Sequence, residues 1–236
     1  MNRRLPSFSP AAFFALLLVC ASPLSAQNTN PTTIRPDSRK PAGENLAVPL
    51  GWKVGFDKPS PDVVIGADEE TADIYFVNMT PGWHITTGPA AVFYHPAVTA
   101  TGVFHAETKI HLFDPGTRNE AFGLIFGGQN LQADNQRYDY FLIRNTGEYL
   151  LKRRTGGGTS TIQGWTKSDA VMRYTDPSVS SVENVLAIDA GAKEVIFSIN
   201  GTTVATFPRA DLHADGLVGL RINHGLNVHV SEFKVE

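Results

Sequence analysis

The chain has 236 residues and carries 20 Lys and Arg against 23 Asp and Glu side chains, a formal net charge of −3 at pH 7. A mildly acidic chain lacks the overall basic footprint of nucleic-acid-binding proteins, so we expect no nucleic acid partner. The only cysteine is Cys20, so the chain after it has no thiol for a disulfide or for a cysteine metal site.

The first 26 residues have the pattern of a secretory signal peptide. Arg3 and Arg4 precede an apolar run at 11–20 that is too short to span a membrane, and small residues lead to an expected cleavage site after Ala26. Cleavage would leave 18 basic and 23 acidic side chains, because only Arg3 and Arg4 are removed from the charged set. We therefore expect an exported protein, periplasmic or extracellular, without membrane insertion after cleavage; a membrane anchor is the alternative.

The remaining chain divides into a tether and one domain. Residues 27–47 are polar, Pro-rich and aperiodic, which favours a disordered tether. From residue 48 to residue 236, short runs of Val, Ile, Phe, Tyr and Thr alternate with clusters of Gly, Asn, Asp and Pro. This spacing is typical of an all-β, two-sheet antiparallel β-sandwich.

Two segments illustrate the strand patterns. In 104–112, Phe104, Ala106, Ile110 and Leu112 alternate with charged residues and histidines, which predicts a half-buried strand. The segment 121–128, "AFGLIFGG", is apolar on both faces, which predicts a central strand.

Turn residues predict two further hairpins. Asn200-Gly201 suits a two-residue type I′ turn, which would pair Phe197 with Val204 and Ile199 with Thr202. The segment 215–236 is interpreted as another hairpin, with a bulge near Ser231-Glu232 that brings the later apolar residues back to the buried face.

The hairpin 138–154, "YDYFLIRNTGEYLLKRR", carries the main candidate site. A two-residue loop at Thr146-Gly147 would place rings and guanidinium groups together on one face: Tyr138, Tyr140, Arg144, Tyr149 and Arg153. Flat rings stack on sugars and guanidinium groups bind hydroxyls or carboxylates, so this face suits carbohydrate. The alternative is that these residues only cover a solvent-exposed sheet, and a change of one residue in the loop would reverse the assignment.

Two tryptophan-containing segments supply further candidates. Trp165 follows the triple glycine 156–158 and is expected near an accessible loop, where ligand sites commonly lie. Trp83 and His84 lie between Gly82 and a Gly-Pro turn, where either a ligand contact or a place in the core is possible. The predicted ligand-binding residues are therefore Tyr140, Arg144, Tyr149, Arg153, Trp165, Trp83 and His84.

Three segments together resemble the concanavalin A-like jelly-roll superfamily of lectins and glucanases. They are "EAFGLIFGG", the hairpin 137–157, and the pair 183–207 with the closing 219–236. Within it, residues 48–236 look like the secreted bacterial laminin-G-like or 3-keto-disaccharide hydrolase (DUF1080) domains. The resemblance implies two curved antiparallel sheets, with carbohydrate often bound on the concave face, and leaves the activity open.

The chain lacks the motifs of the common catalytic sites. No strand places two acids at the alternate positions that the glucanase branch uses, and there is no G-x-S-x-G or H-E-x-x-H motif. We expect no cofactor and no metal; calcium at 132–136 with Asp114, Asp134 and Asn135 is the weaker alternative to a polar loop. The preferred function is non-catalytic carbohydrate binding, and the alternatives are a glycoside hydrolase of the 3-keto-disaccharide type and a structural or protein-interaction module.

Overall fold

The computed structural model describes residues 46–236, so the predicted signal peptide and nearly all of the predicted tether lie outside the described residues. This part of the chain is all-β, as predicted, apart from the short 3₁₀ helix η1 (Arg209–Asp211). Within 46–236, no helix has the length and apolar character needed to cross a membrane.

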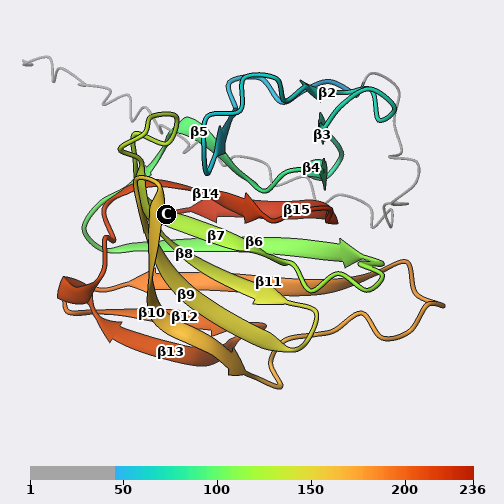
Figure 1. Cartoon of the computed structure of the whole chain (residues 1–236). Coiled ribbons are helices and arrows are strands. Elements are labelled where there is room, and N and C mark those ends of the chain that lie inside the picture. The colour runs from blue at the N-terminus through green and yellow to red at the C-terminus, as the bar shows by residue number, and fades with distance from the viewer. Residues whose placement is uncertain (1–45) are drawn as a thin grey trace, which may run out of the picture. The chain divides into compact units, whose positions relative to one another are not determined.

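The strands form two sheets that pack face to face (Figure 1). The seven-stranded sheet has the order β1-β5-β14-β7-β8-β9-β10. Its strands are β1 (Lys53–Phe56), β5 (Ala91–Ala100), β7 (Ala121–Gln129), β8 (Arg137–Arg144), β9 (Glu148–Thr155), β10 (Gly158–Lys167) and β14 (Gly216–Ile222). All pairs within it are antiparallel.

The eight-stranded sheet has the order β13-β12-β11-β6-β15-β4-β3-β2. Its strands are β2 (Ile65–Gly66), β3 (Ile74–Asn78), β4 (Trp83–Thr87), β6 (Phe104–Phe113), β11 (Ser181–Ala190), β12 (Glu194–Ile199), β13 (Thr202–Pro208) and β15 (Asn227–Val235). Only the short β2–β3 pair is parallel. In Figure 1 the seven-stranded sheet is nearer the viewer, with β7 to β10 in front of β11 to β13.

The main core lies between the two sheets and is rich in phenylalanine. Phe126 and Phe141 of the seven-stranded sheet meet Phe197 of the other at ring centroid distances of 5.7 and 5.2 Å. All three rings are fully buried, and full burial of such a side chain stabilises the fold by about 1.5–3 kcal/mol. With no cysteine after residue 20, packing of this kind holds the sandwich together.

Several local predictions are confirmed. Strand β6 buries alternate residues from Phe104 onward, and β7 is the fourth of seven strands, hence central. Asn200 and Gly201 have φ of 50° and 78° and join β12 to β13, as a type I′ turn requires. The ladder between β15 and β6 shifts register between Val230 and Glu232, at the predicted bulge.

Two predicted pairings are wrong. Phe197 pairs with Ala205, not Val204, because the ladder of β12 and β13 shifts register beside Ser198. The segment 215–236 is not a hairpin, since β14 lies in the seven-stranded sheet and β15 in the eight-stranded sheet. Both strands form ladders with strands far away in sequence, which local turn chemistry does not reveal.

Candidate functional site

The outer face of the seven-stranded sheet, the side turned away from the core, carries rings and cations. Because Phe141 and Ile143 of β8 enter the core, Tyr138, Tyr140 and Arg144 turn outward. On β9, Lys152 and Arg154 lie opposite Tyr140 and Tyr138. The apolar members of this face form a second buried cluster: Val92, Tyr94, Ala121, Ile125, Leu131, Tyr138, Tyr140, Leu142 and Leu150.

A carboxylate bridges two arginines above this cluster. Asp57 follows β1, and the guanidinium of Arg221 donates to both of its oxygens, at 2.8 and 2.9 Å. Arg154 Nη2 lies 2.8 Å from Asp57 Oδ2, and Arg221 also donates to the Tyr138 hydroxyl at 2.8 Å. One acid therefore ties together β1, β14, β8 and β9.

Asp57 and Arg221 hold each other in their charged forms. Burial alone would raise the pKa of Asp57, but the hydrogen bonds and charges of Arg221 and Arg154 outweigh it and hold that pKa below its ordinary value. Burial alone would lower the pKa of Arg221, yet Asp57 and the neighbouring tyrosine hydroxyls raise it. Asp57 is therefore ionised at neutral pH and is unsuited to donate a proton.

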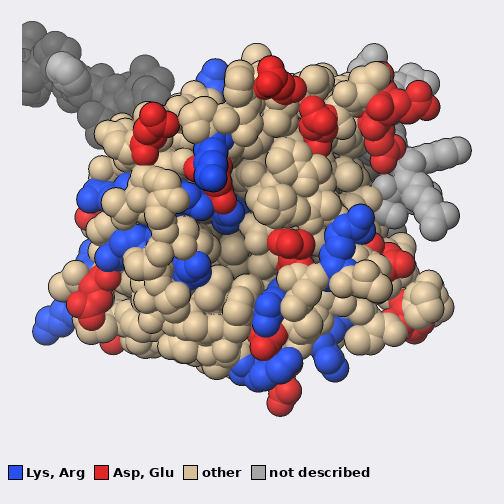
Figure 2. Space-filling view, viewed as in Figure 1, with Lys and Arg blue, Asp and Glu red and all other residues tan. Residues whose placement is uncertain are grey.

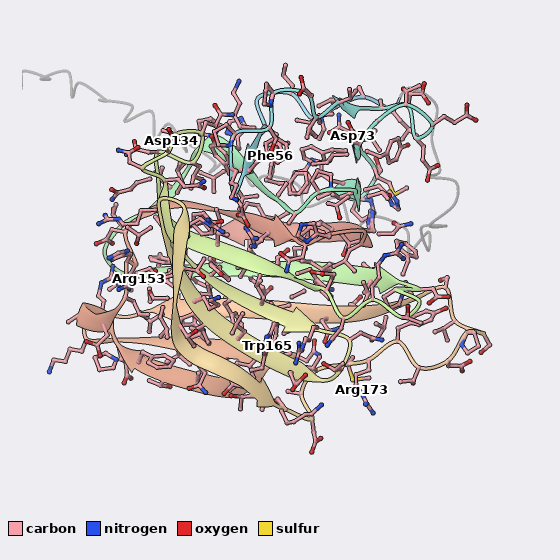
Figure 3. The ribbon with its side chains drawn as sticks, in the orientation of Figure 1. Phe56, Asp73, Asp134, Arg153, Trp165 and Arg173 are labelled. Atoms are coloured by element: carbon pink, nitrogen blue, oxygen red, sulfur yellow. The ribbon has the colours of Figure 1, made fainter. Side chains whose placement is uncertain are left out.

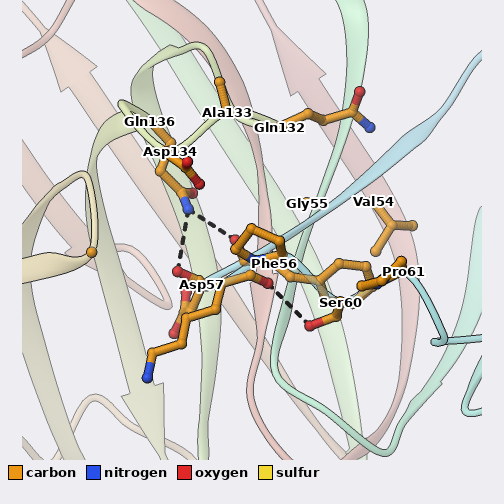
Figure 4. A pocket seen from close by; sticks show the side chains of 13 residues that line it. Val54, Gly55, Phe56, Asp57, Ser60, Pro61, Gln132, Ala133, Asp134 and Gln136 are labelled. Carbon is orange, nitrogen blue, oxygen red and sulfur yellow. Dashed lines mark hydrogen bonds between the residues drawn. The ribbon is translucent and has the colours of Figure 1, made fainter.

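A pocket of about 520 Å³ opens beside this network (Figure 4). It is lined by the end of β1, the segment 57–61, Gly157 and four loop residues, which are Gln132, Ala133, Asp134 and Gln136. Gln136 is buried in its wall, and its Nε2 donates to the Phe56 carbonyl at 2.9 Å. The amide oxygen of Gln136 is buried and has no hydrogen-bond partner among the described residues.

The opposite end of the outer face carries an exposed indole. Trp165 of β10 is 38% exposed, and the Cζ atom of Arg144 lies 4.0 Å from the centroid of its ring. Glu148 accepts from Arg144 Nε at 2.8 Å and lies 3.8 Å from Lys167 Nζ. A hydrogen bond from Thr146, together with these cations, lowers the pKa of Glu148. Figure 3 shows Trp165 apart from Phe56 and Asp134, which mark the pocket.

The structure brings together three of the seven predicted site residues. Tyr140, Arg144 and Trp165 share the outer face, with Tyr140 in its buried floor and Trp165 at its accessible margin. Trp83 and His84 belong to β4 of the other sheet. Trp83 packs against Trp52 and Phe233, and His84 is 1% exposed.

The predicted orientation of Tyr149 and Arg153 is wrong. The turn between β8 and β9 has three residues, because Arg144 pairs with Glu148 and Gly147 takes a φ of 81°. Tyr149 therefore points into the sandwich, where its hydroxyl donates to the Val204 carbonyl at 2.8 Å. Arg153 also lies on the core side of β9 and donates to both oxygens of the fully buried Asp139.

A contact distant in sequence explains the longer turn. Asn145 exchanges two hydrogen bonds with the backbone of Tyr174, at 2.6 and 3.1 Å. Asn145 is thereby held in the loop rather than in the ladder, and every residue of β9 turns to the face opposite to the predicted one.

Sequence reasoning did not identify the groups that surround Asp57. Arg221 alternates with the core residues Leu220 and Ile222, a pattern that could have marked it as outward-facing. Nothing in the sequence joins Asp57 to Arg221, which is 164 residues away. Gln136 could not have been found either, since its role depends on the loop that folds against β1.

Asp57 and Glu148 lie too far apart on this face to form a catalytic pair. Asp57 contacts Arg154 of β9, and Arg154 is six positions from Glu148 on the same strand, roughly 20 Å at about 3.3 Å per residue. Paired glycosidase carboxylates lie only about 5–9.5 Å apart. Among residues 46–236, no group of three His, Asp or Glu side chains is arranged to hold a metal ion. Asp114 accepts from the Gly116 amide at 2.8 Å, and Asp134 lines the pocket.

No family model and no curated protein matches the chain. Solved structures with a similar fold include the carbohydrate-binding module CBM66 from Bacillus subtilis, which has 13% identity and a TM-score of 0.55, with 79% of this chain and 95% of that chain covered. A family 16 endo-glucanase from Bacteroides ovatus has 9% identity and a TM-score of 0.52, covering 78% and 94%. The carbohydrate recognition domain of Emp46p has 11% identity and a TM-score of 0.50, covering 78% and 88%.

At these identities the comparisons bear on the fold, not on the activity. The chain folds as a two-sheet jelly-roll sandwich, as its strand and turn pattern suggested.

Proposed function

We propose that this protein binds carbohydrate without catalysis, through the outer face of the seven-stranded sheet and the pocket beside Asp57. The observation that carries this proposal is that one sheet face offers both kinds of group that sugars need. Trp165 offers an exposed ring, and the pocket is lined by Phe56 together with the polar side chains of Gln132 and Asp134. Rings stack on the apolar side of a pyranose, while amides and cations hold its hydroxyl groups.

The contacts that we propose come from the margins of the face, because Tyr138 and Tyr140 are 0% and 5% exposed. Trp165 and Arg144 would act at one end, and Phe56, Gln132 and Asp134 at the other. Lys152 lies between these two ends on β9. Tyr149, Arg153, Trp83 and His84 are omitted because they lie on the core side or in the other sheet.

Two of the solved structures with a similar fold are named for carbohydrate binding, which supports this proposal. One is named as a carbohydrate-binding module and one as a carbohydrate recognition domain. The expected export of the chain is consistent with a glycan met in the periplasm or outside the cell, although the signal pattern lies in residues 1–26, outside the described residues.

The hydrolase alternative is favoured by the two family 16 enzymes among the similar folds, one of them in complex with a glucan product. A general acid needs a raised pKa, whereas the pKa values of Asp57 and Glu148 are both lowered by neighbouring groups. These two acids are also too far apart to flank one glycosidic bond. We therefore prefer binding to hydrolysis on this face.

A glycan array with the full chain tests the proposal, with Trp165→Ala as the informative variant. We expect Trp165→Ala to weaken binding by about 1–2 kcal/mol, or roughly 5- to 30-fold, because it removes a ring at the contact. Val103→Ala is the control, since Val103 is 73% exposed in the turn between β5 and β6. Absence of binding to every glycan, or equal affinity of the two variants, would count against the proposal.

A further inference from the structure

The two outer faces of the sandwich carry opposite net charge. On the strands of the seven-stranded sheet, the outward positions hold six cations and one carboxylate: Lys53, Arg144, Lys152, Arg154, Lys167, Arg221 and Glu148. Asp57, directly after β1, adds a second carboxylate. On the eight-stranded sheet the outward positions hold five carboxylates and two lysines: Glu107, Glu183, Asp189, Glu194, Glu232, Lys109 and Lys234. An acidic chain therefore presents one basic face.

The carboxylates of the basic face do not neutralise it. Asp57 is shared by Arg154 and Arg221, and Glu148 is shared by Arg144 and Lys167, so each group keeps one positive charge in excess. Within the described residues, no carboxylate lies within 4.0 Å of Lys152. Figure 2 shows Lys and Arg side chains around a hollowed area of the face seen in that view.

Lys152 lies between the two charge-sharing groups. It is two residues from Arg154 and four from Glu148 on the same side of β9, about 7 and 13 Å along the strand. It lies opposite Tyr140 on β8 and Thr161 on β10, neither of which is acidic. Its ammonium group therefore has no carboxylate partner within 46–236 and lies on the same face as the exposed Trp165.

We propose that the ligand of this face is an acidic glycan, with a carboxylate or sulfate held at Lys152 beside Arg154 while a neighbouring sugar stacks on Trp165. This inference rests on the proposed carbohydrate binding and names its ligand class. A basic face on an acidic chain attracts anions by its local field, and charge-assisted hydrogen bonds to an anionic group are about twice as strong as neutral ones.

Matched ligands test the acidic preference. The full chain is titrated with a uronic-acid oligosaccharide, with the same oligosaccharide after reduction of its carboxyl groups to alcohols, and with a sulfated oligosaccharide. We expect the reduced ligand to bind at least tenfold more weakly than one of the acidic ligands. We also expect the affinity for that acidic ligand to fall as the salt concentration is raised. The preferred acidic ligand then identifies which anionic group is recognised.

Variants of Lys152 test the location. We expect Lys152→Gln to remove most of the difference between acidic and reduced ligands, Lys152→Glu to reverse it, and Lys152→Arg to retain it. Lys109→Gln is the matched control, because Lys109 is a half-exposed lysine on the other outer face. Thermal unfolding of each variant separates loss of binding from loss of folding.

Each outcome has a distinct meaning. Equal affinity for the acidic and reduced ligands overturns the acidic preference and leaves carbohydrate binding standing, whereas absence of binding to any glycan overturns the proposed function itself. Equal loss in Lys152→Gln and Lys109→Gln overturns the location. Binding of single-stranded DNA as tight as that of the acidic glycan would identify a general polyanion surface and would also overturn the inference.

Discussion

At the scale of single residues, Asp139 and Arg153 form an ion pair on the core side of the seven-stranded sheet. Asp139 is fully buried, and Arg153 donates to its two oxygens at 2.7 and 2.8 Å. Asp139 also accepts from the His213 amide at 2.8 Å, which fastens the segment after η1 to β8. An ion pair of this kind is costly to break from one side, because the remaining charge stays buried and unpaired.

We predict that Arg153→Met lowers the free energy of unfolding by about 3–5 kcal/mol without changing the glycan affinity of the folded fraction. Urea unfolding and glycan titration of the same preparation measure the two quantities. Lys109→Met is the control, since its half-exposed pair with Glu183 should contribute at most about 1 kcal/mol. A stable Arg153→Met protein that no longer binds glycan would restore Arg153 to the ligand site.

At the scale of elements, three adjacent strands of the other sheet place histidines side by side. His229 of β15 lies opposite His111 of β6 and His84 of β4, with ring centroids 5.7 and 6.5 Å away. His84 and His229 are each 1% exposed. Burial lowers the pKa of His84 to about 4, and burial with the neighbouring histidines lowers the pKa of His229 to about 3.

These lowered pKa values predict acid sensitivity. At pH values between the unfolded pKa of about 6.5 and the folded pKa values, the unfolded chain binds more protons than the folded chain. The contribution of the neutral histidines to stability is therefore fully present above pH 6.5 and is lost as the pH falls below it. Each buried histidine should contribute a loss of about 2 kcal/mol between pH 6.5 and pH 5. We therefore expect the loss of stability between pH 7.5 and pH 5 to be about 2 kcal/mol smaller in His229→Gln than in the unmodified chain.

Unfolding in urea at the two pH values measures this difference. Thr86→Ser, a small change at a half-buried residue of β4, is the control and should keep the pH dependence of the unmodified chain. An unchanged pH dependence in His229→Gln would contradict the account of the histidine row.

The strands and turns differ in how well local sequence predicts them. Strand patterns and the Asn200-Gly201 turn are local, and they predicted β6, β7 and the β12–β13 turn correctly. The β8–β9 turn is held by two hydrogen bonds between Asn145 and the backbone of Tyr174, 29 residues away, so its length could not be deduced from local residues alone. That single extra residue moved Tyr149 and Arg153 to the core side and brought Lys152 and Arg154 outward.

At the scale of the whole molecule, the two faces of the sandwich differ in chemistry. One sheet presents cations, an exposed tryptophan and a pocket, while the other presents mainly carboxylates and buried histidines. The sequence predicted the sandwich because alternation and turn residues are repeated along the chain. It did not predict the candidate site, because Asp57, Lys152 and Arg221 come to one face only after four or more strands have paired.

Hydrogen–deuterium exchange of the full chain, with and without the glycan that binds best on the array, shows whether the glycan covers the outer face of the seven-stranded sheet. We expect slower exchange in 57–61, in 132–136 and along β10, with no change in β6 and β11. Protection confined to β6 and β11, or no protection anywhere at saturating glycan, would contradict glycan binding on that face.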